Sequence, residues 1–316
     1  MLAVHLENGN VALKRRAQPK RKAGFALIRM LAAGVCNTDL ELRRGYYGFT
    51  GTPGHEFIGE VVEADTRALV GKRVGGEINL ACGGCEYCAR NLGRHCLKRT
   101  VLGIVKHPGA FAEYLTLPET NLHVIPAALS TEEAVFVEPL AAACEILDQV
   151  KLAPGSRVAV LGDGKLGILI AQALTAHGAE VVHYGRHKAK LKLGGAAQRH
   201  IAGGKLPPMS FDTVIEATGS PEGLHQAVSM TKPRGTLVMK STVHGLVSID
   251  TAPIIVHEIT LVGSRCGRFE PALRLLKSGQ VSVAAMIHDT FPLKDAPRAF
   301  DRAAERGVLK VLLKPD

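Results

Sequence analysis

The chain has 316 residues, of which 46% are hydrophobic and 22% charged, and its formal net charge is +10. This length exceeds one ordinary domain, and the composition is typical of a globular rather than a disordered protein. No uncharged apolar run reaches the ~18 residues that cross a bilayer. Because only 4% of residues are aromatic and Trp is absent, a surface that stacks nucleic-acid bases is not expected. We therefore expect neither a membrane nor a nucleic acid as a partner.

A basic stretch at residues 14–22 precedes the apolar sequence GFALIRMLAAGVC, which loosely resembles a signal peptide. Arg29 interrupts the apolar part, and no clear small-residue cleavage site follows. We therefore expect a cytoplasmic protein, whose cysteines stay reduced and can bind metal.

The first 125 residues hold short runs of β-forming residues separated by Gly and Pro, which predicts strands. These runs are ALIRML (26–31), FIGEVVEA (57–64), AEYLTL (112–117) and LHVIP (122–126). From about residue 150, strands, glycine turns and amphipathic helices alternate, which predicts a parallel sheet with crossover helices. The strands expected there are RVAVLG (157–162), EVVHYG (180–185), FDTVIEATG (211–219), GTLVMKST (235–242) and EITLVGSR (258–265). The last fifty or so residues return to a helix, at 270–278, and end in VLKVLLKP.

Four of the seven cysteines lie within residues 81–96, which read ACGGCEYCARNLGRHC. The spacing C-x2-C-x2-C-x7-C predicts a tetrahedral thiolate site for one zinc ion. Four sulfurs leave no position open for water or substrate, so this zinc would be structural. The predicted ligands are Cys82, Cys85, Cys88 and Cys96.

A glycine-rich turn, GDGKLG (162–167), follows the strand RVAVL and opens a helix. The first glycine would form the turn, the second would let a pyrophosphate approach the backbone, and the third would let the helix pack on the strand. The N–H groups at the helix start would face the phosphates. With a strand before it and a helix and second strand after it, this motif predicts dinucleotide binding. The residues assigned to the cofactor here are Gly162, Gly164, Lys165, Leu166 and Gly167.

The end of the second strand bears on which dinucleotide binds. NAD sites usually place an acid there, which accepts a hydrogen bond from the ribose 2′-OH. This chain has Gly185 at that position, followed by Arg186, His187 and Lys188. An acid would repel a 2′-phosphate, whereas glycine leaves room and a guanidinium binds phosphate through two donors. We predict that NADP(H) is preferred over NAD(H).

A second candidate metal site lies outside the cysteine-rich segment. Cys36 occurs in GVCNTDLE, His55 in GHEFIGE and Glu138 in FVEPLAA. Together they would supply one sulfur, one nitrogen and one oxygen, a three-ligand zinc shell with an open fourth position. The sequence alone does not place them together.

These motifs, with AFAEYL, EATGS and GSR, occur in the order found in the zinc-dependent medium-chain dehydrogenases, which include alcohol and polyol dehydrogenases. The chain resembles this family over nearly its whole length. The resemblance implies an α/β fold: a GroES-like, β-rich catalytic domain and an inserted Rossmann domain with a doubly wound parallel sheet. We expect the first domain at 1–138, with the zinc lobe at 81–96, the Rossmann domain at 139–264, and a return to the catalytic domain at 265–316.

The resemblance also assigns residue roles at the catalytic zinc. Cys36 and His55 look like ligands, and either Glu56 or Glu138 would be the third, whereas Cys144 and Cys266 are expected in the core. In this comparison, Thr38 resembles the hydroxyl proton relay and Asp39 the acid that orients the zinc histidine. Many relatives carry a relay histidine where this chain has Glu41. Residues expected to line the cofactor are Thr218, Gly219 and Ser241, with Lys310 near the pyrophosphate.

The resemblance implies an oxidoreductase with one catalytic and one structural zinc, which exchanges a hydride between NADP(H) and an alcohol or polyol, or its carbonyl partner. Two alternatives remain: a zinc-free reductase on the same scaffold, and a non-catalytic module that binds zinc and nucleotide. The loops around residues 46–49 and 104–108 hold no pattern that identifies the substrate. We also expect a homodimer or homotetramer, formed through edge strands of the Rossmann sheet around Leu261 or Leu237.

Overall fold

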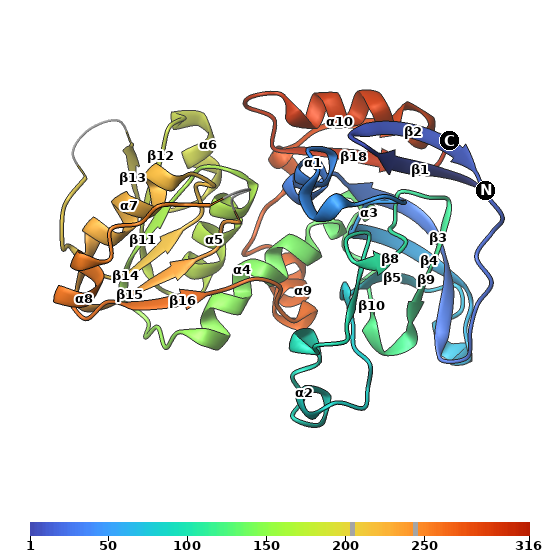
Figure 1. Ribbon diagram of the computed structural model, residues 1–316, viewed down its shortest axis with the longest axis horizontal. Coiled ribbons are helices and arrows are strands. Elements are labelled where there is room, and N and C mark those ends of the chain that lie inside the picture. The colour runs from blue at the N-terminus through green and yellow to red at the C-terminus, as the bar shows by residue number, and fades with distance from the viewer. Residues whose placement is uncertain (203–205, 243–245) are drawn as a thin grey trace. The chain divides into compact units, whose positions relative to one another are not determined.

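The computed structural model describes residues 1–202, 206–242 and 246–316. The chain forms two compact units, one of Met1–Glu138 with Val283–Asp316 and one of Pro139–Ser282 (Figure 1). The domain boundaries expected at 138/139 and 264/265 stay predictions. No helix in the described part of the chain is long and apolar enough to span a membrane.

The first unit is built on a seven-stranded, mostly antiparallel sheet of order β10-β5-β4-β3-β18-β17, in which β9 also pairs with β3. A hairpin of β1 and β2 and a small sheet of β6, β7 and β8 complete its strands. Their bounds are β1 (Leu2–Glu7), β2 (Asn10–Arg15), β3 (Phe25–Gly34), β4 (Glu56–Glu63), β5 (Arg73–Gly76), β6 (Asn79–Leu80), β7 (Thr100–Leu102), β8 (Lys106–His107), β9 (Tyr114–Pro118), β10 (Leu122–Val124), β17 (Ile287–Pro292) and β18 (Lys310–Lys314). The four β runs predicted in residues 1–125 correspond to β3, β4, β9 and β10.

Helices are short in this unit. They are α1 (Asn37–Arg43), α2 (Glu86–Ala89), α3 (Thr131–Ala134) and α10 (Ala296–Ala304). The longer α4 (Val137–Gln149) begins at the end of this unit's first segment and continues into the second unit.

The second unit is a six-stranded sheet of order β13-β12-β11-β14-β15-β16, in which every strand pair is parallel. Its strands are β11 (Arg157–Leu161), β12 (Glu180–Gly185), β13 (Gln198–Ile201), β14 (Phe211–Glu216), β15 (Thr231–Met239) and β16 (Thr260–Gly263). Its remaining helices are α5 (Lys165–Ala176), α6 (Lys188–Leu193), α7 (Pro221–Met230), α8 (Ala252–Val256) and α9 (Phe269–Lys277). The predicted parallel sheet with crossover helices is confirmed, and α9 lies at the predicted helix.

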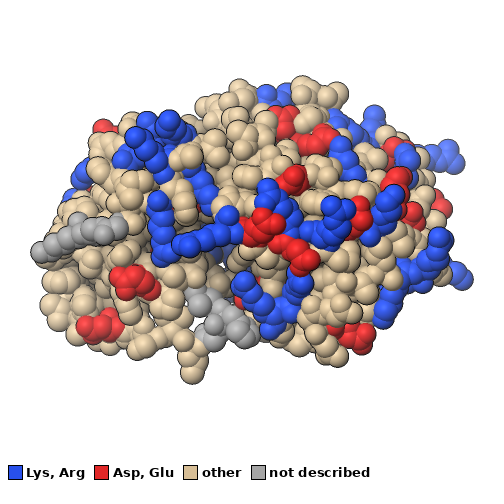
Figure 2. Space-filling model, turned by 90° about the horizontal axis from the view of Figure 1, so that it is seen from above, with Lys and Arg blue, Asp and Glu red and all other residues tan. Residues whose placement is uncertain are grey.

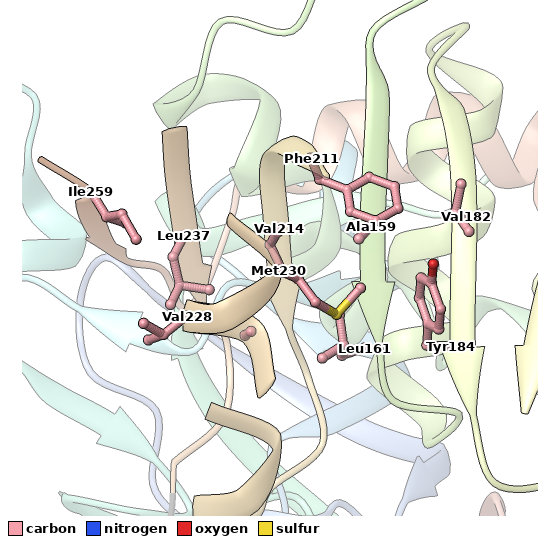
Figure 3. Packing of buried hydrophobic residues seen from close by; sticks show 11 residues of the cluster. Ala159, Leu161, Val182, Tyr184, Phe211, Val214, Val228, Met230, Leu237 and Ile259 are labelled. Carbon is pink, nitrogen blue, oxygen red and sulfur yellow. The ribbon is translucent and has the colours of Figure 1, made fainter. Parts of the chain in front are cut away.

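Apolar strands explain why this sheet is buried. The strand RVAVL is buried from its second residue on, as expected for a parallel strand covered on both faces. Figure 3 shows the core between the sheet and α7, where Val214, Leu237 and Phe211 from the strands meet Met230 and Val228 from the helix end.

The strand order changes direction between β11 and β14. From β11 the sheet extends to one side through β12 and β13, and to the other side through β14, β15 and β16. Right-handed crossovers then put the helices of the two halves on opposite faces of the sheet. In such sheets the ligand binds at the carboxyl ends of the strands, where the order reverses. The glycine turn after β11 and the EATGS segment after β14 both lie at this point.

Candidate active site

Three potential metal ligands meet in the first unit. The sulfur of Cys36, a ring nitrogen of His55 and a carboxylate oxygen of Glu56 all lie within 4.8 Å of one another. His55 and Glu56 are buried, and Cys36 is half-buried. Cys36 stands immediately before α1, and the other two stand at the start of β4.

Strand pairing explains why these residues meet. Strands β3 and β4 are antiparallel, with Gly34 opposite Glu56. Cys36 lies two residues beyond Gly34, and His55 lies one residue before Glu56, so the register brings both to the same end of the pair. Gly54 has φ +98°, and a Cβ there would come within 2.5 Å of the Phe111 ring. A glycine is therefore required directly before His55.

Asp39, which is fully buried, ties the two segments together. Its Oδ2 accepts a hydrogen bond from the backbone N–H of Cys36 at 2.8 Å, and its Oδ1 accepts one from the N–H of Gly54 at 3.1 Å. Oδ1 also lies 3.5 Å from Nδ1 of His55, which has no hydrogen-bond partner among the described residues. The carboxylate therefore faces Nδ1 and leaves Nε2 as the nitrogen that points away from it.

The electrostatics of this group favour a cation. Burial by itself would lower the pKa of His55, but the neighbouring Asp39 and Cys36 outweigh burial and raise this pKa well above its ordinary value. Sulfur, imidazole nitrogen and carboxylate oxygen are also the donor types that zinc takes at sites with an open position. The three side chains therefore fit a zinc ion.

Lys310 contacts Glu56 directly. Its Nζ donates a hydrogen bond to Oε2 of Glu56, and its side chain is completely buried, 5.3 Å from the centre of the Phe136 ring. Burial would lower the pKa of Lys310, but the charge of Glu56 raises it above its ordinary value. A Cβ at Gly34 would come within 2.7 Å of Glu56, so this close pair needs the glycine. The predicted role of Lys310 beside a pyrophosphate is wrong, because its ammonium group is buried against a carboxylate.

Thr38 and Glu138, two other predicted catalytic residues, lie near this group. The hydroxyl oxygen of Thr38 is 3.8 Å from the sulfur of Cys36. Glu138 does not join the group within 4.8 Å, although its charge contributes to the raised pKa of Lys310. Glu41 accepts a hydrogen bond from Arg44 at 2.6 Å.

The four clustered cysteines form a second candidate metal site, in an exposed lobe around α2. The sulfur–sulfur distances are 3.5 Å for Cys85–Cys88, 3.6 Å for Cys85–Cys96 and 4.0 Å for Cys82–Cys88. Disulfide sulfurs would be ~2 Å apart, whereas a tetrahedron with Zn–S bonds of ~2.3 Å places its sulfurs ~3.8 Å apart. The spacing therefore fits zinc.

The thiols of this lobe differ in acidity. A backbone hydrogen bond from Cys88, in α2, is the largest influence on Cys85 and lowers its pKa to about 6, whereas burial raises the pKa of Cys88 to about 11. Thiolates, not thiols, are the metal-binding form of cysteine.

In the second unit, the glycine turn has the tight geometry that the sequence predicts. Gly162 has φ +120°, and a Cβ on Gly167 would overlap the Gly162 carbonyl oxygen. That carbonyl accepts a hydrogen bond from Nε2 of His183 at 2.8 Å. Burial lowers the pKa of His183, so the ring is neutral with its proton on Nε2. His183, on β12, thus positions the turn from the neighbouring strand.

A hydrogen-bonded cluster lies at the carboxyl ends of β14 and β15. The buried Glu216 accepts hydrogen bonds from the N–H and hydroxyl of Thr218, both at 2.6 Å, and one from Ser241 at 3.3 Å. Ser241 in turn accepts a hydrogen bond from the N–H of Gly219 at 2.9 Å. These residues border a pocket whose lining includes Glu216, Ser220 and Ser241. The three residues predicted from EATGS and LVMKS are therefore together.

Beside Gly185 lies a carboxylate that the sequence analysis did not use. A Cβ built on Gly185 would be 2.5 Å from Cβ and 2.8 Å from Cγ of Asp163. Oδ2 of Asp163 accepts hydrogen bonds from the N–H groups of Arg186, at 2.7 Å, and His187, at 2.6 Å, and lies 2.9 Å from Nδ1 of His187. Arg186 and Lys188 are exposed. The room that Gly185 leaves is filled by Asp163.

Comparison with known proteins identifies the family. The Alcohol dehydrogenase GroES-like domain family matches residues 22–127, and the Zinc-binding dehydrogenase family matches residues 204–278. The chain is 31% identical to L-threonine 3-dehydrogenase from Streptomyces avermitilis, over 94% of this chain and 93% of the relative. It is 27% identical to sorbitol dehydrogenase from Halalkalibacterium halodurans, over 97% of this chain and 96% of the relative. The chain belongs to the zinc-containing medium-chain alcohol/polyol dehydrogenase family.

A solved structure of another dehydrogenase agrees. The crystal structure of a protein described as a zinc-binding dehydrogenase from Sinorhizobium meliloti 1021, bound to NADP, superimposes with a TM-score of 0.89. The two chains are 30% identical, and the match covers 99% of each. The predicted GroES-like domain and Rossmann-like parallel sheet of this dehydrogenase are confirmed.

Sequence reasoning missed several residues of these sites. The sequence assigned no role to Asp163, between two glycines of the turn, to Glu216, within EATGS, or to His183, within a predicted strand. Because side chains alternate between the two faces of a strand, the pattern of EVVHYG assigns His183 to one face. Nothing in the sequence identifies the carbonyl of Gly162 as its partner. Cys144 is buried, as predicted, and burial raises its pKa to about 12. Cys266 is only half-buried, so its predicted place in the core is wrong.

Proposed function

We propose that this protein is a zinc-dependent dehydrogenase that transfers a hydride between a nicotinamide dinucleotide and an alcohol or polyol, or the corresponding carbonyl compound. The observation that carries the proposal is the group of Cys36, His55 and Glu56, in a chain whose second unit has a glycine turn at the switch point of a parallel sheet. A structural zinc site alone would not need this second group.

Cys36, His55 and Glu56 would hold the catalytic zinc, with Glu56 rather than Glu138 as the carboxylate ligand. When bound, zinc supplies a Lewis acid for the substrate oxygen and the nicotinamide accepts or donates the hydride. Asp39 accepts a hydrogen bond from the backbone of Cys36 and faces Nδ1 of His55 at 3.5 Å, so its carboxylate would orient both donors toward the metal. The four cysteines of the α2 lobe would hold the structural zinc.

Thr38 is the residue that we propose for proton transfer. Its hydroxyl stands beside Cys36, 3.8 Å from the sulfur, and a hydroxyl can accept one proton while it donates another. It would take the proton of the substrate hydroxyl during oxidation and return it during reduction. Glu41, held by Arg44, is the candidate for the next group outward.

For the cofactor, we propose a preference for NADP(H). The exposed Arg186 and Lys188 offer positive charge to a 2′-phosphate. The related Sinorhizobium meliloti protein was crystallised with NADP. The cofactor would lie along the glycine turn, with Thr218, Gly219 and Ser241 near the nicotinamide ribose.

For the substrate, we propose a polyol or another polyhydroxylated alcohol. The EPLA motif and the similarity to a sorbitol dehydrogenase support this class. The net charge of +10 also suits an anionic alcohol, such as a phosphorylated or carboxylated one. A panel of alcohols, polyols and sugar phosphates, followed by nicotinamide absorbance, would separate these substrates.

Metal counting tests the mechanism. The proposal predicts two zinc ions per chain in the parent, one in Cys36→Ser, and loss of dehydrogenase activity in that variant. Cys144→Ser is the matched control, because its thiol lies outside both metal groups, and it should keep both ions. A single zinc in an active parent would instead support a zinc-free reductase. Two zinc ions without turnover of any alcohol or carbonyl compound would favour a binding module.

A further inference from the structure

Strand β12 ends at Gly185, where other dinucleotide sites carry an acid. The space that a side chain of residue 185 would take is filled by Asp163. The Cβ, Cγ and Oδ2 of Asp163 lie 2.5, 2.8 and 2.9 Å from the place where a Cβ of residue 185 would be. A side chain at residue 185 could therefore not coexist with this arrangement. In other dinucleotide sites the acid at this place belongs to the strand end. Here the carboxylate at this place belongs to Asp163, in the glycine turn.

The surroundings of Asp163 hold it as an anion. Burial would raise its pKa, but hydrogen bonds from His187 and Arg186 outweigh burial and lower the pKa below its ordinary value. All three contacts use Oδ2, and Oδ1 accepts no hydrogen bond from the described residues. The side chain is 13% exposed, so Oδ1 is the oxygen available to a ligand.

We propose that Asp163 determines how well this dehydrogenase distinguishes NAD(H) from NADP(H): its carboxylate can accept a hydrogen bond from the ribose 2′-OH of NAD(H) and opposes the 2′-phosphate of NADP(H). The inference rests on the proposed dinucleotide function. A strand-end acid has this effect because it accepts from the hydroxyl and repels the phosphate. Asp163 meets the same requirement from another segment.

Side chains of opposite charge then set the cofactor preference. Arg186 and Lys188 attract a 2′-phosphate, which carries up to about two negative charges at neutral pH. Asp163 lies against the same backbone segment and repels that phosphate. It also accepts hydrogen bonds from the N–H groups of Arg186 and His187, so these two donors are not free for the phosphate. The preference for NADP(H) should therefore be smaller than the basic side chains alone would give, and it should widen when the charge of Asp163 is removed.

Asp163→Asn tests this, because asparagine keeps an oxygen that can accept from the two N–H groups but loses the charge. We would measure the dissociation constants of NADPH and NADH for the zinc-loaded enzyme by calorimetry. The ratio of NADH to NADPH dissociation constants should rise about 10-fold relative to the parent, which is 1.4 kcal/mol. Asp212→Asn is the control. This exposed acid pairs with Lys232 near the amino end of β14, opposite the cofactor edge, and its loss should leave the ratio unchanged.

Three outcomes would overturn the proposal: an unchanged ratio, equal weakening of both cofactors, or the same change in Asp212→Asn. Equal weakening would mean that Asp163 only supports the loop. If Asp163→Asn fails to fold by circular dichroism, Asp163→Ser gives the same test, because its hydroxyl is also an uncharged acceptor. A parent that prefers NADH would contradict the NADP(H) preference but not the role of Asp163. A parent that binds neither cofactor would contradict the proposed function itself.

Discussion

At the residue scale, the candidate catalytic site balances several buried charges before any ligand is considered. Asp39, His55, Glu56 and Lys310 have exposed fractions of 0, 3, 1 and 0%. Burying a charged group is costly unless it is paired and hydrogen-bonded. Asp39 accepts two backbone N–H groups, and Glu56 accepts the ammonium of Lys310. Lys310 thus stabilises the carboxylate that we propose as a zinc ligand.

This pairing leads to a prediction about Lys310. In the zinc-free protein, Lys310→Met should lower the free energy of unfolding by about 3 kcal/mol, because removing one partner leaves the buried charge of Glu56 uncompensated. In Glu56→Gln/Lys310→Met the loss should be smaller than the sum of the two single losses, by about 1–3 kcal/mol. Urea unfolding at neutral pH measures all four proteins, with Lys310→Arg as the variant that keeps the charge. Additive losses would show that the two side chains do not stabilise each other.

At the element scale, the α2 lobe depends on its metal more than on a core. In residues 81–96 only Cys96 is buried, so little apolar surface holds the lobe together. Cys85→Ser should lower the zinc content by one ion per chain and expose the lobe to proteolysis between residues 81 and 96. Metal analysis and limited proteolysis followed by mass spectrometry check both effects. Cys266→Ser, which changes a thiol outside both metal groups, should leave both unchanged. A full zinc content in Cys85→Ser would contradict the four-sulfur site.

A second element-scale prediction concerns pH. Glu132, on α3, accepts a hydrogen bond from Lys314 on β18, and this contact is the main reason that the pKa of Glu132 lies below its ordinary value. A carboxyl with a depressed pKa in the folded state contributes stability above its unfolded pKa, and this contribution is lost as pH falls through the folded pKa. Glu132→Gln should therefore be slightly less stable than the parent at pH 7, by about 0.5 kcal/mol as for exposed pairs. The difference should shrink as pH falls below about 4 and disappear below the depressed pKa of the folded state. Thermal unfolding at pH 7 and through an acid series measures it, and a difference that stays constant through the acid series would exclude this ion pair as the cause.

How much of each site the sequence predicted depended on how local its contacts are. The cysteine lobe and the glycine turn each lie within about 16 residues, so spacing alone defined them. Cys36 and His55 needed the pairing of β3 with β4, which the sequence did not supply but the family resemblance did. The contact of Lys310 with Glu56 joins residues 254 positions apart. No local pattern encodes such a contact, and for this reason Lys310 was assigned to the wrong partner.

The cofactor preference shows a different kind of limit. The sequence predicted NADP(H) from the residue at one position, Gly185, on the assumption that a missing side chain leaves space. The structure fills that space with Asp163, which is 22 positions earlier. Whether a glycine leaves room depends on what packs against it, and only tertiary structure specifies that neighbour.

At the scale of the whole molecule, the charge of +10 does not gather into one basic surface on the face seen in Figure 2. Lys and Arg are spread across this face, and Asp and Glu lie among them near its middle. Attraction of an anionic substrate by the net positive charge weakens as ionic strength rises.

Association of chains is the remaining whole-molecule property, and we propose a homo-oligomer formed through β16. Leu237 is excluded as an edge residue, because it lies on β15, which pairs on both sides, and is fully buried. Leu261 lies on the edge strand β16 and is 39% exposed. An edge strand presents unpaired N–H and C=O groups that a second chain can complete.

Leu261→Arg should therefore shift the sedimenting species towards one 33.6-kDa chain at micromolar concentration, because it places a charge in the expected interface without an ionic partner. Ile201→Arg is the matched control. Ile201 is 54% exposed on β13, the opposite edge of the same sheet, so this change adds the same charge at an edge where no contact is proposed. Sedimentation velocity of the parent and both variants decides between the edges. A monomeric parent would contradict association, an unchanged Leu261→Arg would exclude β16, and dissociation of Ile201→Arg alone would place the interface on β13.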